Sequence, residues 1–283
     1  MSTQVQERIR LIQEALREER LEGWLLYNFR GSNVFATRIL ELPPHIIQTR
    51  RYFYFIPAKG SPKKLDQTTE YDVQQFMLSE FKRRGLKTKE APNCSVNANS
   101  ANPHYEPTRE LNRPLNRGDF VLIDLWAKKD KPRSVYADIT WTGYIGETVP
   151  AEYAKVFEVV KGGRDAALRF VQQSYASGTE IYGCQVDDAA RRSIEQHGYG
   201  ESFVHRTGHS IGEEIHGNGA NMDNLETRDE RKVIARTSFS IEPGIYLPGK
   251  FGIRSEIDVY ISKSREVIVT GLPMQDAVVP ILK

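Results

Sequence analysis

The stretch DFVLIDLWAKKDKPRSVYADITWT, residues 119–142, holds two apolar runs on either side of a charged turn. Two apolar strand-like runs that flank a polar turn predict an antiparallel β-hairpin. Each run carries one aspartate, Asp124 in the first and Asp138 in the second. If the hairpin is symmetric about Lys131, the two aspartates face each other directly. Like charges in that position destabilise a sheet unless something compensates them.

A second hairpin is expected over residues 237–261, and it repeats the pattern. Glu242 and Glu256 have the same separation as the two aspartates, and their midpoint is Gly249. With the period of two of a strand, Arg254 lies on the same face as Glu256. Two facing pairs of carboxylates in apolar strands require concentrated positive charge. Divalent metal ions supply it most simply.

Three of the six histidines lie close together: His205, His209 and His216. A lone histidine is more often structural than a ligand, but such a cluster is harder to explain in that way. Gly208 and Gly212 lie between these histidines and would let the backbone approach a site closely. Oxygen-rich ligation favours Mn²⁺, and a histidine ligand also admits Co²⁺, Zn²⁺ or Fe²⁺.

The ordered set of acids and histidine resembles the metal ligands of the pita-bread metallopeptidases. That family contains methionine aminopeptidase, Xaa-Pro aminopeptidase and prolidase. The matching residues are Asp124, Asp138, His209, Glu242 and Glu256. The segments IDLWA, YADITW, HRTGHSIGEEIHG, SIEPGIY and GIRSEID are similar to the five ligand motifs of the family, and the similarity covers roughly residues 69–283. It implies an α+β pita-bread fold, in which both hairpins join one curved antiparallel sheet covered by helices.

The resemblance also implies a reaction, the hydrolysis of Xaa-Pro bonds with two divalent ions, most simply Mn²⁺. Asp124 would bind one ion, Asp138 would bridge both, and His209 would bind the other. Glu242 and Glu256 would contact one ion or both. A hydroxide between the ions would attack the scissile carbonyl, with Glu242 as the general base. The substrate would be a dipeptide, or a longer peptide, with proline in the second position.

Three further histidines match substrate-contacting positions of the family. His104, in a loop before the first hairpin, and His216 match histidines that contact the substrate and stabilise the tetrahedral intermediate. His205 matches one that lines the proline side of the pocket. The remaining histidines, His45 and His197, are assigned no role.

Two other residues share the strand face of the ligands and could orient the carboxylates, namely Thr140 and Arg254. For Arg254 an equally good interpretation is a simple ion pair with Asp258, which has the same parity.

Residues 1–65 are expected to form a shortened N-terminal domain, similar to the one carried by creatinase and the Xaa-Pro branch. Residues 66–283 are expected to form the catalytic domain. The apolar spacing predicts a helix over 4–20 and strands over 24–27 and 52–56. Further helices are expected over 69–84, 152–173 and 180–197.

Two rival functions remain open. A methionine aminopeptidase would share the ligands but would lack a strand-bearing N-terminal section. A pita-bread module without catalysis would bind a partner, but such modules typically lose metal ligands, and all five are present here. Relatives of the Xaa-Pro branch are commonly dimers, so a homodimer is expected by analogy.

The composition is that of a folded protein, with 39% hydrophobic and 27% charged residues among 283. A net charge of +2 gives no electrostatic footprint for nucleic acid or for an anionic membrane surface. The sequence has neither a long apolar span nor an apolar leader segment, so a cytoplasmic location is expected. Cys94 and Cys184 are expected to be free, buried thiols, because two cysteines make no disulfide framework.

Overall fold

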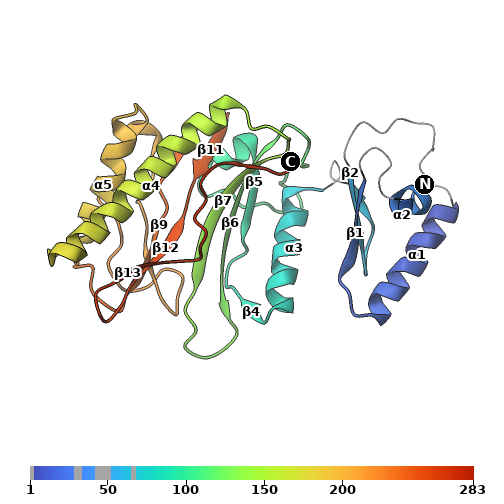
Figure 1. The fold of residues 1–283 in the computed structure, drawn as a ribbon, viewed down its shortest axis with the longest axis horizontal. Coiled ribbons are helices and arrows are strands. Elements are labelled where there is room, and N and C mark those ends of the chain that lie inside the picture. The colour runs from blue at the N-terminus through green and yellow to red at the C-terminus, as the bar shows by residue number, and fades with distance from the viewer. Residues whose placement is uncertain (1–2, 29–33, 42–51, 65–67) are drawn as a thin grey trace. The chain divides into compact units, whose positions relative to one another are not determined.

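The computed structural model describes residues 3–28, 34–41, 52–64 and 68–283 (Figure 1). Their contacts divide the chain into two compact units. The first comprises Met1–Thr69 with Pro114–Arg117 and Leu282, and the second comprises the remainder. The predicted domain boundary, between residues 65 and 66, lies outside the described residues and stays a prediction.

The first unit is a small sheet with two helices. Its antiparallel strands follow the order β1 (Gly23–Asn28), β2 (Tyr52–Pro57) and β3 (Lys63–Lys64). The helices are α1 (Thr3–Glu18) and α2 (Val34–Ile39). Apolar side chains of both helices, of two strands and of the residue directly after β2 form its core: Val5, Ile9, Leu16, Leu26, Ala36, Tyr54, Ile56 and Ala58. The helix and both strands predicted for this section are confirmed.

The second unit contains three sheets. Its strands are β4 (Leu86–Lys87), β5 (Asn93–Val96), β6 (Phe120–Lys129), β7 (Ala137–Tyr144), β8 (Ser210–Ile211), β9 (Ser238–Ile241), β10 (Gly244–Leu247), β11 (Phe251–Arg254), β12 (Ile257–Ile261), β13 (Val267–Thr270) and β14 (Val279–Pro280). One sheet has the order β14-β7-β6-β4, with β5 also paired to β6; a second has the order β13-β12-β9-β8, and β10 pairs with β11. All these pairings are antiparallel except that of β14 with β7.

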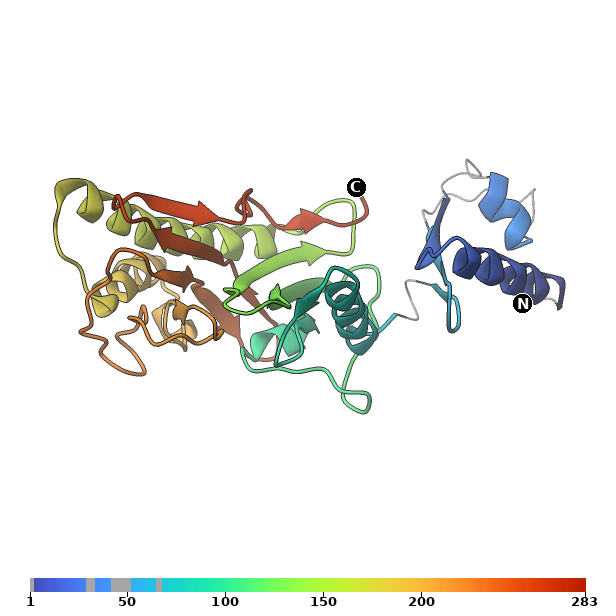
Figure 2. The ribbon, with the colours of Figure 1, turned by 90° about the horizontal axis from the view of Figure 1, so that it is seen from below.

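The helices of this unit are α3 (Glu70–Arg83), α4 (Ala151–Ser177) and α5 (Gly183–Glu195), which confirms the three helices predicted for this part of the chain. Helix α4 packs against α5 and lies along β9, β10, β11 and β13 (Figures 1 and 2). Val156, Phe157 and Val160 of α4 are buried there. No described helix is both long and apolar enough to cross a membrane.

The first predicted hairpin exists, as β6 and β7, but its predicted register is wrong. Asp124 pairs with Thr140, and Asp138 pairs with Trp126. The symmetry about Lys131 fails because residues 130–136 make no ladder with each other. Within that connection Arg133 adopts a φ of +58°, and the Tyr136 N–H donates to Gly212 O instead. The two aspartates are therefore diagonal neighbours on one face.

The second hairpin has the predicted register. Gly244 pairs with Arg254, and further from the turn Ile241 pairs with Ile257. Glu242 and Glu256 lie between these two pairs, at positions that face each other in the same register. Gly249 forms the turn with a φ of +74°, a conformation that glycine adopts without strain.

Candidate metal centre

A cavity of about 270 Å³ in the second unit collects most of the predicted site residues. Those that line it are His104, Asp124, Asp138, His205, His209, His216, Glu242 and Arg254. The other two, Thr140 and Glu256, are 0% and 1% exposed. The predicted residues are thus brought together from both hairpins and from the loops that carry the histidines.

The backbone joins the histidine segment to the second hairpin. The Ser240 N–H donates to His209 O (2.9 Å), and the Glu242 N–H donates to Thr207 O (2.7 Å). Gly208 lies between these bonds, and a Cβ there would be 2.0 Å from Ser240 O. The backbone at Gly208 therefore lies too close to the neighbouring strand for any side chain, whereas a Cβ at Gly212 would meet open space.

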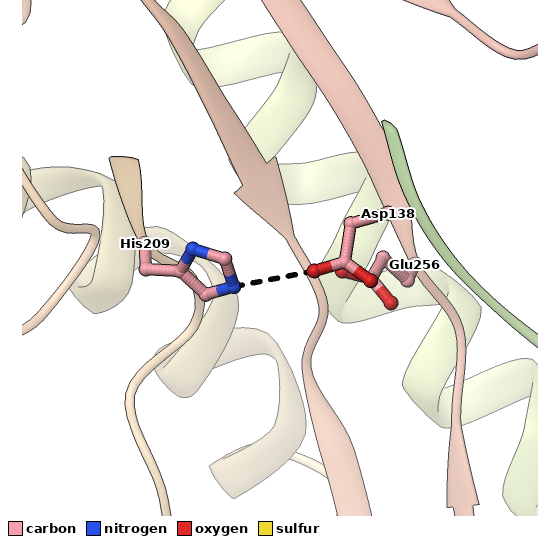
Figure 3. A group of neighbouring side chains, drawn as sticks. All are labelled: Asp138, His209 and Glu256. Atoms are coloured by element: carbon pink, nitrogen blue, oxygen red, sulfur yellow. Dashed lines mark ion pairs between the residues drawn. The ribbon is translucent and has the colours of Figure 1, made fainter. Parts of the chain in front are cut away.

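Asp138, His209 and Glu256 form the tightest group of candidate ligands (Figure 3). One ligand atom of each lies within 4.8 Å of the others. The Nε2 atom of His209 is 3.4 Å from Asp138 Oδ2 and 3.3 Å from Glu242 Oε1. Its other ring nitrogen, Nδ1, lies 3.2 Å from Ser210 O. A proton on Nδ1 would satisfy that carbonyl and leave the Nε2 lone pair to face the carboxylates.

Several carboxylate oxygens of the site are buried and find no hydrogen-bond donor within the described part of the chain. They are Asp124 Oδ1, Asp138 Oδ1 and Glu256 Oε1. An anionic oxygen without a donor or a cation is costly in a protein interior. Oxygen ligands with one imidazole suit Mn²⁺ and also admit Co²⁺, Zn²⁺ and Fe²⁺. The residues present therefore fit divalent metal ions.

The site strongly perturbs its acids. Burial raises the pKa of Asp124 to about 7, against the opposing effect of Arg254. Burial, with the neighbouring carboxylates, raises the pKa of Asp138 and holds that of Glu256 well above its ordinary value. Such perturbed groups clustered in one cavity are typical of functional sites. A cation bound here would favour the ionised form of these carboxyl groups and so lower their raised pKa values.

Glu242 and His209 have the opposite electrostatic setting. Burial disfavours the charge of Glu242, but His209 and Arg254 outweigh it and lower the pKa of this carboxyl. Burial likewise disfavours a charged His209, but Asp138 and Glu242 raise its pKa to about 8. Glu242 Oε1 also accepts a hydrogen bond from Ser240 Oγ (2.9 Å), which orients the carboxylate.

Thr140 and Arg254 contact the candidate ligands directly. Thr140 Oγ1 donates to Glu256 Oε2 (2.7 Å) and accepts from Arg254 Nε (2.9 Å). The Arg254 guanidinium pairs with the Asp124 carboxylate rather than with Asp258. Asp258 Oδ2 accepts from the Asp138 N–H (2.9 Å) and so fixes the backbone of another ligand. The ion pair of Arg254 with Asp258, considered above, is therefore not formed.

The other histidines lie around the same cavity in different settings. His205 Nε2 is 2.8 Å from the Tyr246 hydroxyl, and burial lowers its pKa to about 4. The His216 ring stands edge-on to His209, with centroids 4.5 Å apart and an interplanar angle of 77°. His104 is exposed on the loop after the 3₁₀ helix Asn97–Ala101.

Sequence reasoning missed several residues that line the cavity or contact its lining residues. Tyr246 could have been found, because in the predicted register it faces Gly252, two residues from Arg254, and thus shares the face of Arg254. Trp126 could also have been found, because it follows Asp124 by two positions on β6. Arg206 and Ile215 lie within the segment 205–217, but no period singles out their side chains. Glu90, Pro103 and Glu226 come from other loops.

A cluster of buried carboxylates and imidazole in one cavity is typical of metal-dependent hydrolases. The family model described as metallopeptidase family M24 matches residues 49–263, and the chain belongs to this family. The match starts before residue 69, where the resemblance was expected to start.

Similar proteins carry peptidase names. A protein of Mycoplasma genitalium named "Putative Xaa-Pro aminopeptidase" is 32% identical over 200 residues, which cover 70% of this chain and 52% of the relative. The chain therefore spans about half the length of this relative. "Probable dipeptidase PepE" of Mycobacterium tuberculosis is 31% identical over 181 residues, or 64% of this chain and 44% of the relative.

Solved structures confirm the fold expected from the sequence. An X-Pro aminopeptidase from Thermotoga maritima superposes with a TM-score of 0.64 at 30% identity, over 75% of this chain and 56% of that one. A prolidase from Thermococcus sibiricus has a TM-score of 0.64 at 20% identity, over 99% of this chain and 100% of that one. The α+β pita-bread fold is thus confirmed.

Proposed function

We propose that this protein is a two-metal exopeptidase that hydrolyses the Xaa-Pro bond at the N-terminus of peptides or in dipeptides. One observation carries the proposal. The buried carboxylate oxygens without donors, on Asp124, Asp138 and Glu256, lie in the same site as the Nε2 atom of His209. The choice of an Xaa-Pro substrate is supported by the names of similar proteins, which include Xaa-Pro aminopeptidases.

Five residues would hold the two ions. Asp124 would bind one ion, Asp138 would lie between both, and His209 would bind the other, with Glu242 and Glu256 completing the set. When bound, a pair of divalent ions activates water at neutral pH and polarises the carbonyl that is attacked. Thr140 and Arg254 would keep Glu256 and Asp124 in place through the bonds described above.

Glu242 is the proposed general base. Its carboxyl has a lowered pKa, so it is ionised near neutral pH and can accept a proton. The bond from Ser240 Oγ holds one of its oxygens toward the cavity. The leaving proline nitrogen must then be protonated, and Glu242 can return the proton to it.

Histidines that line the cavity are candidates for contacts with the peptide. His104 and His216 are proposed to contact the substrate, and His205 to line the proline side. Because burial keeps the His205 imidazole neutral at pH 7, that side carries no cationic charge from it. An Xaa-Pro amide has no N–H to donate, so a site that works through a carboxylate base and cations does not lose a substrate contact there.

Hydrolysis of matched peptides tests the proposal. Xaa-Pro dipeptides, longer Xaa-Pro peptides and a Met-Ala peptide would be incubated with the protein and Mn²⁺. Cleavage confined to proline substrates is expected, and the length series separates dipeptidase from aminopeptidase activity. Preferential cleavage of Met-Ala would indicate a methionine aminopeptidase instead. Silence on all substrates with two ions bound would indicate a non-catalytic binding module.

Two further predictions accompany this function. By analogy with the Xaa-Pro branch we propose a homodimer, which sedimentation analysis would test. We also propose that the protein acts in the cytoplasm, which cell fractionation would test.

A further inference from the structure

Glu70, the first residue of α3, is a carboxylate with 0% exposure that lies outside the cavity lining. Its Oε1 accepts a hydrogen bond from the Val96 N–H (2.6 Å). Its Oε2 accepts from the Arg113 N–H (2.8 Å) and from the Tyr105 hydroxyl (2.6 Å). Asn99 Nδ2 lies within 3.0 Å of both oxygens. These donors compensate the buried carboxylate.

All four donors belong to one segment, residues 96–113, and this segment carries His104. The part before His104 is fixed elsewhere as well. Ser100 Oγ accepts from the Gly252 N–H (2.9 Å), which ties the 3₁₀ helix to β11. Asn97 Oδ1 accepts from the Phe120 N–H (2.9 Å) at the start of β6.

Tyr105 is the next fixed point after His104. The Tyr105 N–H closes a turn onto Asn102 O (3.0 Å), and Asn102 Oδ1 accepts from the His104 N–H (3.0 Å). Because the Tyr105 hydroxyl reaches Glu70, the chain on either side of His104 is held. The imidazole itself is exposed and lines the cavity.

We propose that Glu70 and Tyr105 are positioning residues for His104. The buried carboxylate holds the Tyr105 hydroxyl, and this bond sets where the neighbouring imidazole stands in the cavity. The proposal rests on the proposed function, in which His104 contacts the substrate. Neither Glu70 nor Tyr105 lines the cavity, so both act through His104.

Two substitutions would break different parts of the hydrogen-bond network around Glu70. Val96, Asn99 and Arg113 would still bind Glu70 if the Tyr105 hydroxyl were removed. Tyr105→Phe therefore releases the link next to His104 and leaves the rest of the network intact. Glu70→Gln replaces one of the two accepting oxygens by an NH2 group, which cannot accept, so the backbone donor on that side, Val96 or Arg113, loses its hydrogen bond.

The test is a double-mutant cycle on kcat with a cleaved Xaa-Pro peptide and Mn²⁺. Tyr105→Phe is expected to lower kcat about 10-fold, with a smaller change in KM, because a misplaced group loses its alignment with the reacting atoms. In the His104→Ala background the same substitution is expected to have no further effect, since the group it positions is absent. Combined with His216→Ala, its effect should persist in full.

Tyr175→Phe is the matched control. Tyr175 lies on α4, away from the cavity lining, and its hydroxyl donates to Val233 O (2.7 Å), a bond similar in length to that of Tyr105. It should leave kcat unchanged. Equal kcat losses from Tyr105→Phe with and without His104 would overturn the positioning role, as would a kcat equal to that of Tyr175→Phe.

A second readout needs no turnover. We expect Tyr105→Phe to broaden or shift the His104 ring signals in NMR spectra. We also expect Glu70→Gln to speed amide exchange at Val96 or Arg113, whichever N–H faces the amide nitrogen. Unchanged ring signals and exchange would overturn the proposal even in an active enzyme. If the wild type cleaves no Xaa-Pro peptide and the signals change as expected, the proposed function fails and the positioning of His104 stands.

Discussion

Asp124 lies directly opposite Thr140 across the β6–β7 ladder, and this register offsets it by two residues from Asp138. Diagonal partners on one face of a sheet are about 7–8 Å apart, whereas direct partners are about 4.5–5.5 Å apart. The offset thus weakens the repulsion between the carboxylates and leaves room for a cation. The position opposite Asp124 is filled by a hydroxyl that accepts from Arg254, whose guanidinium pairs with Asp124.

Replacing that hydroxyl should weaken metal binding. Thr140→Val removes the donor to Glu256 and the acceptor for Arg254 while keeping the shape of the side chain. We expect metal affinity to fall about 10- to 100-fold, as when a partner of a ligand is lost. Calorimetric titration with Mn²⁺ measures this. Thr142→Val is the matched control, because Thr142 is buried on the same strand and its hydroxyl contacts Gln275. Equal affinities in the two variants would contradict the role of Thr140.

Glu242→Gln should keep the fold and lose nearly all turnover. The amide is isosteric but cannot accept a proton, so kcat should fall by a factor of about 10² to 10⁴. Steady-state kinetics and a thermal unfolding curve would be compared with Glu230→Gln, an exposed acid on another loop. Full activity in the Glu242 variant would remove its assignment as the base.

Removal of metal should abolish activity and lower stability. Without cations the buried carboxylates lose the charge that balances them. An ion that binds the folded state at 100 times its Kd contributes about 2.7 kcal/mol to the free energy of unfolding. We therefore expect a chelator to lower the melting temperature and to stop Xaa-Pro hydrolysis, and Mn²⁺ or Co²⁺ to restore both. Undiminished hydrolysis in excess chelator would end the two-metal proposal.

Arg164→Met should destabilise the second unit. Arg164 on α4 is 1% exposed and donates to Ser255 Oγ and Gln275 O, both at 2.7 Å. Its loss leaves those acceptors and the paired Asp165 without their partner, at a cost of about 3 kcal/mol. Urea unfolding measures the difference. Arg169→Met, on the exposed side of the same helix, should cost far less, and equal costs would show that the buried network contributes nothing.

His197→Ala should be nearly silent. His197 is exposed after α5, and its Nδ1 atom contacts the Ser193 carbonyl (2.8 Å) rather than any residue of the cavity. Surface changes of this kind alter the free energy of unfolding by less than about 0.5 kcal/mol. A large loss of turnover, measured on the same peptides, would reveal a site that the cavity does not include.

The second hairpin was predictable in register, and the first was not, for a physical reason. Gly249 permits a tight turn with positive φ, so the midpoint of Glu242 and Glu256 could be located from the sequence. The connection 130–136 has several polar residues that could each form the tip. Its course is decided by contacts far along the chain, such as that of Tyr136 with Gly212. Local sequence does not contain that information.

The same distinction holds for the site. Residues on strands could be placed by parity, which grouped Arg254 with Glu256 and would have added Tyr246. Glu90, Arg206 and Glu226 line the cavity from loops that are far apart in the sequence or follow no repeating pattern. Their roles could not be predicted, because loops have no period.

The candidate ligands come from hairpins far apart in the chain, with Asp124 and Asp138 on one and Glu242 and Glu256 on the other. An ion bound between them is a reversible cross-link that closes a very long loop. Neither hairpin alone can offer the complete set, so tight metal uptake becomes a reporter of the assembled unit. The supply of metal would then determine the stability of the folded protein as well as its activity.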